Sequence, residues 1–112
     1  MPVTSSPVGA TPLSAAIFGN RHLANVLATA AAIEAEHELV TTRRVASRTG
    51  LADSVVRAVL LRLVDAGVVE PTLREGGARG QQFYAIKATD LARSIVAAAQ
   101  VVAGNESRQR SS

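Results

Sequence analysis

The 112-residue chain contains no cysteine and no tryptophan, and its only aromatic residues are Phe18, Phe83 and Tyr84. The lack of cysteine excludes disulfides, thiolate metal sites and cysteine-based catalysis. With so few rings, the hydrophobic core must be built from Ala, Val, Leu and Ile. No run of about 18 apolar residues occurs, so we expect no membrane-spanning helix. The length fits one domain with a modest core of small aliphatic side chains.

Lysine is almost absent as well, because eleven of the twelve basic residues are arginine. The net charge of +3 is distributed unevenly: residues 1–38 carry −2, residues 39–88 carry +4 and residues 89–112 carry +1. A positive middle segment permits a nucleic-acid partner but does not require one.

The patterns of an enzyme are also missing. No glycine-rich phosphate loop follows a predicted strand, and neither His22 nor His37 has a Ser and an Asp nearby in a recognisable arrangement. The glycine cluster GGARG lies in a predicted hairpin, not at a helix start, so it does not resemble a nucleotide-binding loop. We therefore expect a protein that is not an enzyme and has no cofactor.

The two ends of the chain differ in composition from its middle. Residues 1–11 contain little besides Pro, Ser, Thr and Gly, which predicts a disordered arm. They lack the charged start and apolar segment of a secretory signal, so we expect a cytoplasmic, nucleoid-associated protein. Residues 12–104 predict one ordered domain, and residues 105–112 predict a disordered tail after a glycine that ends the last helix.

Helical periodicity runs from Pro12 to about Glu38, with a break predicted at the FGN of residues 18–20. Leu39 and Val40 predict a very short strand. Thr41 or Thr42 then caps a short helix that ends at Gly50, with its three arginines directed outward. The apolar face of the earlier, longer helix contains Leu23, Val26, Leu27, Ala30, Ala31 and Ile33.

The stretch GLADSVVRAVLLRLVDAGVVE, from Gly50 to Glu70, predicts a turn, a helix with Asp53 as its N-cap and a stop at Gly67. Steps of about 100° per residue separate this helix into a buried and an outward face. The buried face contains Val56, Val59, Leu60 and Leu63; the outward face contains Ser54, Arg57, Leu61 and Asp65, flanked by Ala58 and Arg62.

A basic hairpin and a final helix complete the chain. The runs VVEPTL and QFYAIK flank REGGARGQ at residues 74–81, which predicts two strands joined by a basic tip. Thr89 or Asp90 then caps the last helix. Its apolar stripe is predicted to contain Leu91, Ile95, Ala98 and Val102.

This order of elements, with the phrase VASRTGLADSVVRAVLLRLVDAGVV, resembles the winged helix-turn-helix domains of bacterial transcriptional regulators of the ArsR and MarR groups. IFGNRHLANVLATAA resembles the first helix of ArsR-like proteins, and FYAIKATD resembles their strand before the final helix. The resemblance covers about residues 13–103. It implies a mainly α fold with a small β-hairpin wing, and N- and C-terminal helices that form a homodimer. It also implies a repressor that binds double-stranded DNA.

In such a domain the helix at about residues 53–66 would enter the major groove, and the wing at residues 74–81 would contact the backbone or the minor groove. Arg57 is expected to contact a base, because arginine can bind guanine O6 and N7 together. An i,i+4 ion pair with Asp53 is the alternative for Arg57. The DNA-binding residues implied are Thr42, Arg43, Arg44, Arg48, Ser54, Val55, Arg57, Ala58, Arg62, Arg74 and Arg79.

Other functions stay open from sequence alone. Val55, Ala58 and Leu61 on the outward face also fit a winged-helix module that docks a partner protein. The fold does not separate a regulator from a DNA-binding protein of plasmid partition, phage or nucleoid. We expect no metal site, because the acidic residues beside His37 are not accompanied by thiol ligands.

Overall fold

The computed structural model describes residues 12–72 and 82–111, with side chains described for residues 13–72 and 82–106. The expected disordered arm at residues 1–11 and the hairpin tip at residues 74–81 lie outside the described residues. The elements in chain order are α1 (Pro12–Phe18), α2 (Leu23–Ala35), β1 (Val40–Thr41), α3 (Thr42–Thr49), α4 (Asp53–Asp65), β2 (Val69–Thr72), β3 (Phe83–Ile86) and α5 (Asp90–Ser111).

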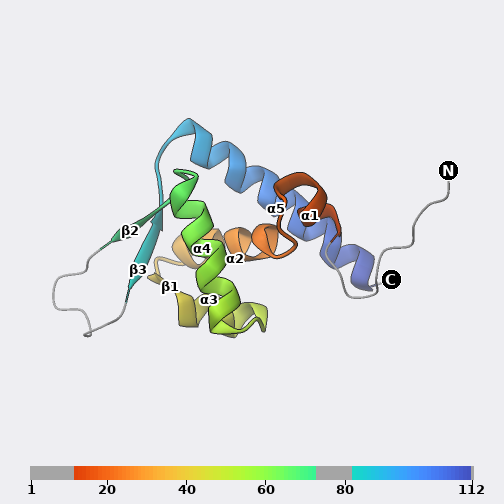
Figure 1. Cartoon of the computed structure of the whole chain (residues 1–112), viewed down its shortest axis with the longest axis horizontal. Coiled ribbons are helices and arrows are strands. Elements are labelled where there is room, and N and C mark those ends of the chain that lie inside the picture. The colour runs from red at the N-terminus through yellow and green to blue at the C-terminus, as the bar shows by residue number, and fades with distance from the viewer. Residues whose placement is uncertain (1–11, 73–81, 112) are drawn as a thin grey trace.

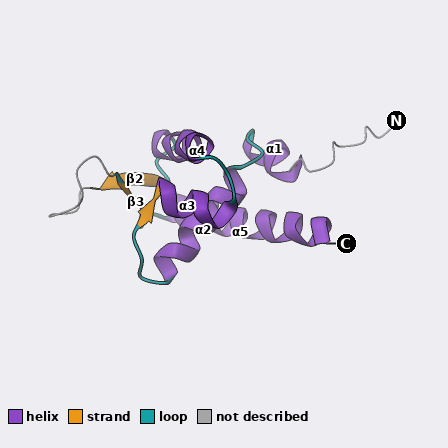
Figure 2. Cartoon of the chain, turned by 90° about the horizontal axis from the view of Figure 1, so that it is seen from below, coloured by secondary structure: helices purple, strands orange, loops and turns teal. Residues whose placement is uncertain are grey.

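The described part of the chain is mainly helical, with one small antiparallel sheet in the strand order β1-β3-β2. The predicted short strand, the break between α1 and α2 and the pairing of the two later strands are therefore confirmed. The β2–β3 hairpin lies at one end of the molecule (Figures 1 and 2), while α1 and the C-terminal part of α5 lie at the other. None of the described helices is long and apolar enough to cross a membrane.

The core is centred on α2, which packs against α3, α4 and α5. It consists of small aliphatic side chains, as the scarcity of aromatics predicts, and burying each medium-sized one contributes about 1.5–3 kcal/mol. The predicted buried face of α4 is confirmed, because all four of its residues are at most 2% exposed. The largest fully buried side chains include Leu27, Ile33, Val45, Val56, Leu60 and Leu63.

A tight connection joins α3 to α4. Thr41 is the N-cap of α3, and its Oγ1 accepts a hydrogen bond of 3.0 Å from the backbone N–H of Arg44. Gly50 ends α3 with a φ of 77°, in the left-handed region where a side chain is unfavourable. The helix that follows begins only three residues later, so a short turn is all that separates α3 from α4.

The N-cap predicted for α4 is wrong by one residue. Ala52 is the N-cap and makes no side-chain hydrogen bond, and Asp53 is the first helical residue. The Asp53 carboxylate instead lies 3.6 Å from the Arg43 guanidinium of α3. A cation on the neighbouring helix thus competes with the backbone for this carboxylate, although the helix dipole still favours an acid in the first turn.

The predicted end of α4 is confirmed. Gly67 has a φ of 80°, its N–H donates to the Val64 carbonyl, and the N–H of Val68 donates to the Leu63 carbonyl. This pair of hydrogen bonds is a Schellman motif, which requires a left-handed residue at its centre. It turns the chain directly into β2.

The last helix differs from its prediction in two respects. First, α5 does not end at Gly104 but continues to Ser111, so residues 105–111 are helical and not part of a disordered tail. The reason is a contact between distant parts of the chain: Glu106 is 4% exposed, and its Oε2 accepts a 2.9 Å hydrogen bond from the Ser14 N–H at the start of α1. Gly104, two residues before Glu106, is therefore an interior residue of α5.

Second, the buried stripe of α5 is rotated from the predicted one. Leu91 and Ala98 are exposed, whereas Ala92 and Ala99 are fully buried. Val102 is buried as predicted. Small side chains let α5 approach α2 closely, and this packing selects the alanines over the larger leucine. Thr89 is the cap of the helix, because its Oγ1 accepts a 3.1 Å hydrogen bond from the Ala92 N–H.

Candidate nucleic-acid interface

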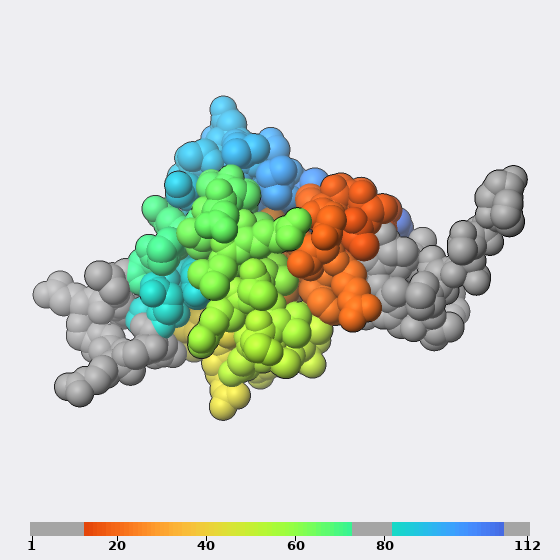
Figure 3. Space-filling model, in the orientation of Figure 1, coloured from red at the N-terminus to blue at the C-terminus, as the bar shows by residue number. Residues whose placement is uncertain are grey.

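Helix α4 presents one side to solvent across the middle of the molecule. In Figure 3 it occupies the centre of the visible face, between α1 and the sheet. The predicted outward residues are exposed, among them Ser54, Arg57, Ala58 and Arg62, while Val55 is half-buried. Leu61, on the same side of α4, is 50% exposed. On the exposed side of α4, the small Ala58 and the apolar Leu61 therefore lie between Arg57 and Arg62.

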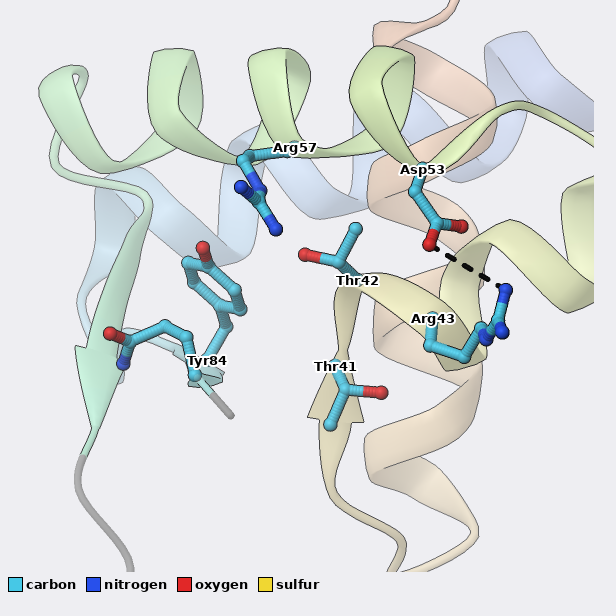
Figure 4. Close-up of a pocket in the computed structure, with 7 residues that line it drawn as sticks. Thr41, Thr42, Arg43, Asp53, Arg57 and Tyr84 are labelled. Atoms are coloured by element: carbon cyan, nitrogen blue, oxygen red, sulfur yellow. Dashed lines mark ion pairs between the residues drawn. The ribbon is translucent and has the colours of Figure 1, made fainter. Parts of the chain in front are cut away.

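A cleft of about 390 Å³ lies beside the N-terminal half of α4, where that helix meets the start of α3 and the sheet. Figure 4 shows Arg57 pointing from α4 into this cleft, toward Thr42 and Tyr84. The cleft therefore brings together residues from α3, α4 and β3. Its lining consists of Thr41, Thr42, Arg43, Asp53, Arg57, Gln82 and Tyr84.

Arg57 has no ion pair within the described residues, because Asp53 is paired with Arg43 instead. The i,i+4 pair considered from sequence is therefore not formed. Arg43 and Asp53 are themselves 83% and 51% exposed, so their 3.6 Å contact is a weak, solvent-screened one. Arg57 is left as a cation at an open cleft, and Arg43 stands at its edge.

Tyr84 is a residue of this cleft that sequence reasoning missed. It is 7% exposed, and its hydroxyl makes no hydrogen bond to any described residue. β3 is the central strand of the sheet, and its pairing places Tyr84 opposite Val40 on one side and Pro71 on the other. The usable signal was a tyrosine in a predicted strand, since an aromatic ring with a hydroxyl at its tip is typical of a site that is apolar at one end and solvated at the other.

Arg44 and Arg48 are placed differently from Arg43. Arg48 forms a bidentate ion pair with Glu36, in which its Nη1 and Nη2 donate hydrogen bonds of 3.0 and 2.5 Å to the two carboxylate oxygens. Its Nη2 also lies 3.5 Å from Oε1 of Glu38. Its hydrogen bonds lower the pKa of the Glu36 carboxyl and raise the pKa of the Arg48 guanidinium. Arg44 donates a 2.6 Å hydrogen bond to the Leu39 carbonyl. Both arginines thus join α3 to the segment after α2.

The remaining predicted residues are spread out. Arg62 lies at the opposite flank of α4, where its Nη2 would be 3.4 Å from a Cβ added to Gly19 in the α1–α2 turn. It lines an apolar groove there and not the cleft of Arg57. Arg74 and Arg79 lie outside the described residues.

The two histidines do not come together. His37 is exposed at the end of α2, with a φ of 62°. His22 is half-buried, and burial together with the neighbouring Arg21 lowers its pKa, opposed by the charge of Glu106. No group of three or more His, Asp and Glu side chains in the described residues could hold a metal ion.

Comparisons of the chain with known protein families, with curated proteins and with solved structures found no match.

Proposed function

We propose that the protein is a winged helix-turn-helix transcriptional regulator that binds double-stranded DNA as a homodimer and acts as a repressor. The observation that carries the proposal is Arg57: an exposed guanidinium with no acidic partner in the described residues, at a cleft beside the N-terminal half of a solvent-facing helix. The tight α3–α4 connection and the β2–β3 hairpin beside α4 support the same proposal.

The direction of Arg57 favours a phosphate contact over the base contact expected from sequence. Its guanidinium faces the hydroxyl-bearing side chains of Thr42 and Tyr84 (Figure 4), and hydroxyls and arginines are the usual donors to DNA phosphates. Base edges would then be met by Ser54, Ala58 and Leu61. Of these, only Ser54 can form hydrogen bonds, whereas the other two suit the methyl group of thymine.

The homodimer is proposed through α5 and, beside it, α1. Residues 94–105 contain no charged side chain, although α5 has an exposed side along this whole stretch. Val101 is 71% exposed there, and Ala97 and Ala98 are exposed beside it. An uncharged, small-residue helix face in water is typical of an interface between subunits. Sedimentation equilibrium of the wild type and of Val101→Lys tests this, since a lysine at the interface should shift the mass toward the monomer.

The DNA proposal is tested by fluorescence anisotropy with a mixed-sequence duplex at about 50–200 mM salt. We compare Arg57→Ala with Arg93→Ala, which removes the same charge from α5, away from the cleft. Arg57→Ala should weaken binding by about 1–3 kcal/mol and reduce the log–log salt slope by about 1 for each subunit of the dimer, while Arg93→Ala should change neither. Equal effects of the two substitutions would refute the assignment of the cleft.

A second candidate function is docking of a partner protein, and the 50% exposure of Leu61 favours it. In that case the wild-type protein should show no measurable DNA affinity even at the lowest salt. Leu61→Asp should then abolish the partner complex, whereas Arg57→Ala should leave it intact. The anisotropy experiment therefore separates the two candidates before any partner is identified.

A further inference from the structure

On the flank of α4 away from the Arg57 cleft lies a groove of about 320 Å³. It is bounded by α1, by the C-terminal half of α4 and by the N-terminal half of α5. Apart from one arginine, the side chains that line it are apolar. They include Ile17, Phe18, Leu63, Leu91 and Ile95.

Two of these apolar side chains are left open to water. Ile17 is 56% exposed and Leu91 is 55% exposed, and they belong to the small set of large hydrophobic residues exposed in the described part of the chain. The helix that carries Ile17 is held in place at its other end, where Ser14 donates to Glu106 and its Oγ donates a 2.6 Å hydrogen bond to the Asn20 carbonyl. The groove is thus a built feature between anchored helices.

The one charged residue lining the groove is Arg62. No described residue forms an ion pair with it. Its guanidinium lies against the backbone of the α1–α2 turn, since a Cβ at Gly19 would be 3.4 Å from Nη2. The groove therefore combines an apolar floor with a single cation at a defined position.

We propose that this groove binds a small amphipathic carboxylate, with the apolar part of the ligand on Ile17 and Leu91 and its carboxylate on Arg62. A guanidinium binds a carboxylate through two parallel hydrogen bonds, and the apolar side chains beside Arg62 offer a surface for the rest of the ligand. A neutral ligand would forgo this interaction and a cationic one would be repelled. The volume suits an aryl-alkyl or medium-chain acid, since ligand pockets start at roughly 300 Å³.

The proposal concerns binding in the groove alone and does not depend on the DNA proposal. The probe pair is 4-phenylbutyrate and its uncharged amide, which differ in charge but little in shape. The full-length protein is titrated with each, and the Ile17 and Leu91 methyl resonances are followed by NMR. We expect these methyls to shift and the acid to bind at least tenfold more tightly than the amide.

Three variants test the role of the cation. Arg62→Gln should reduce the affinity for the acid to that for the amide, whereas Arg62→Lys, which retains the charge, should preserve most of the preference. Arg93→Gln removes the same charge elsewhere on the surface and should leave both affinities unchanged. A circular dichroism spectrum and melting curve for each variant establish that it is folded.

Equal affinity for acid and amide would overturn the proposal. Equal behaviour of Arg62→Gln and Arg93→Gln would also do so, as would methyl shifts confined to other parts of the protein. A second copy of the chain in the groove is a further outcome that overturns it: the Ile17 and Leu91 resonances would then move with protein concentration and remain unaffected by either probe.

Discussion

Replacing glycine by alanine at residues 104 and 67 should change stability in opposite directions. No atom lies within 4 Å of a Cβ built at either position, so no steric contact contributes to either change. Gly104 lies inside α5, where alanine is favoured over glycine by about 1 kcal/mol. Gly67 has a φ of 80°, where alanine is disfavoured by about 1–2 kcal/mol.

The expected result is a rise in the free energy of unfolding for Gly104→Ala and a fall for Gly67→Ala. For a domain of this size each kcal/mol corresponds to roughly 4–8 °C in melting temperature, so the two variants should differ by about 10 °C or more. Urea and thermal unfolding followed by circular dichroism measure both quantities. All samples are compared at one protein concentration, with the mass of each verified by sedimentation because residue 104 lies near the proposed dimer face.

The outcome that would refute this reasoning is a loss of stability in Gly104→Ala similar to that in Gly67→Ala. It would mean that residue 104 is a left-handed helix stop, as the sequence alone suggests. The continuous helix through residues 105–111 would then be wrong.

Three other contacts yield predictions. Glu106→Ala removes a buried acceptor at the start of α1 and should cost about 1.5–3 kcal/mol, with hydrogen exchange speeding up first in α1; unchanged exchange there would contradict it. Thr41→Ala removes the N-cap of α3 and should lower the free energy of unfolding in urea by about 1 kcal/mol. Thr42→Ala removes no cap and should lower it clearly less. Because Arg48 lowers the pKa of Glu36 in the folded state, this pair stabilises the fold above the ordinary carboxyl pKa. That stabilisation is lost as the pH falls through the lowered value. An NMR titration should show the pKa of Glu36 rising in Arg48→Gln, and an unchanged value would count against the pair.

Much of the local structure could be predicted because its causes are local. A glycine in the left-handed region ends α3 and α4, a threonine hydroxyl caps α3 and α5, and the spacing of aliphatic residues sets the buried face of α4. Each of these follows from a few neighbouring residues. The predicted stop at Gly104 failed for the complementary reason: just after it, the Glu106 carboxylate accepts a hydrogen bond from the backbone N–H of Ser14 in α1, ninety-two residues earlier in the chain.

The candidate site was predictable only in outline. The sequence placed Arg57 on the outward face of a helix, and this is confirmed. It did not show that Tyr84 lies beside it, because that neighbour comes from a strand brought close by the sheet. Nor did it show that Arg43 and Arg48, two basic residues of one short helix, have different acidic partners. The acidic residues that pair with Arg48 lie at and just after the end of α2. The residue spacing within α3 does not reveal that this segment lies beside it.

By itself, then, the sequence determined the order of helices and strands, the apolar face of α4 and where positive charge is concentrated, because those properties depend on side chains within a turn or two of each other. The tertiary structure alone decided which arginines remain unpaired, how far α5 extends and where an apolar groove meets a single cation. Those outcomes depend on the partners that folding brings within a few ångströms of each side chain, and residues close in the folded chain are often far apart along it.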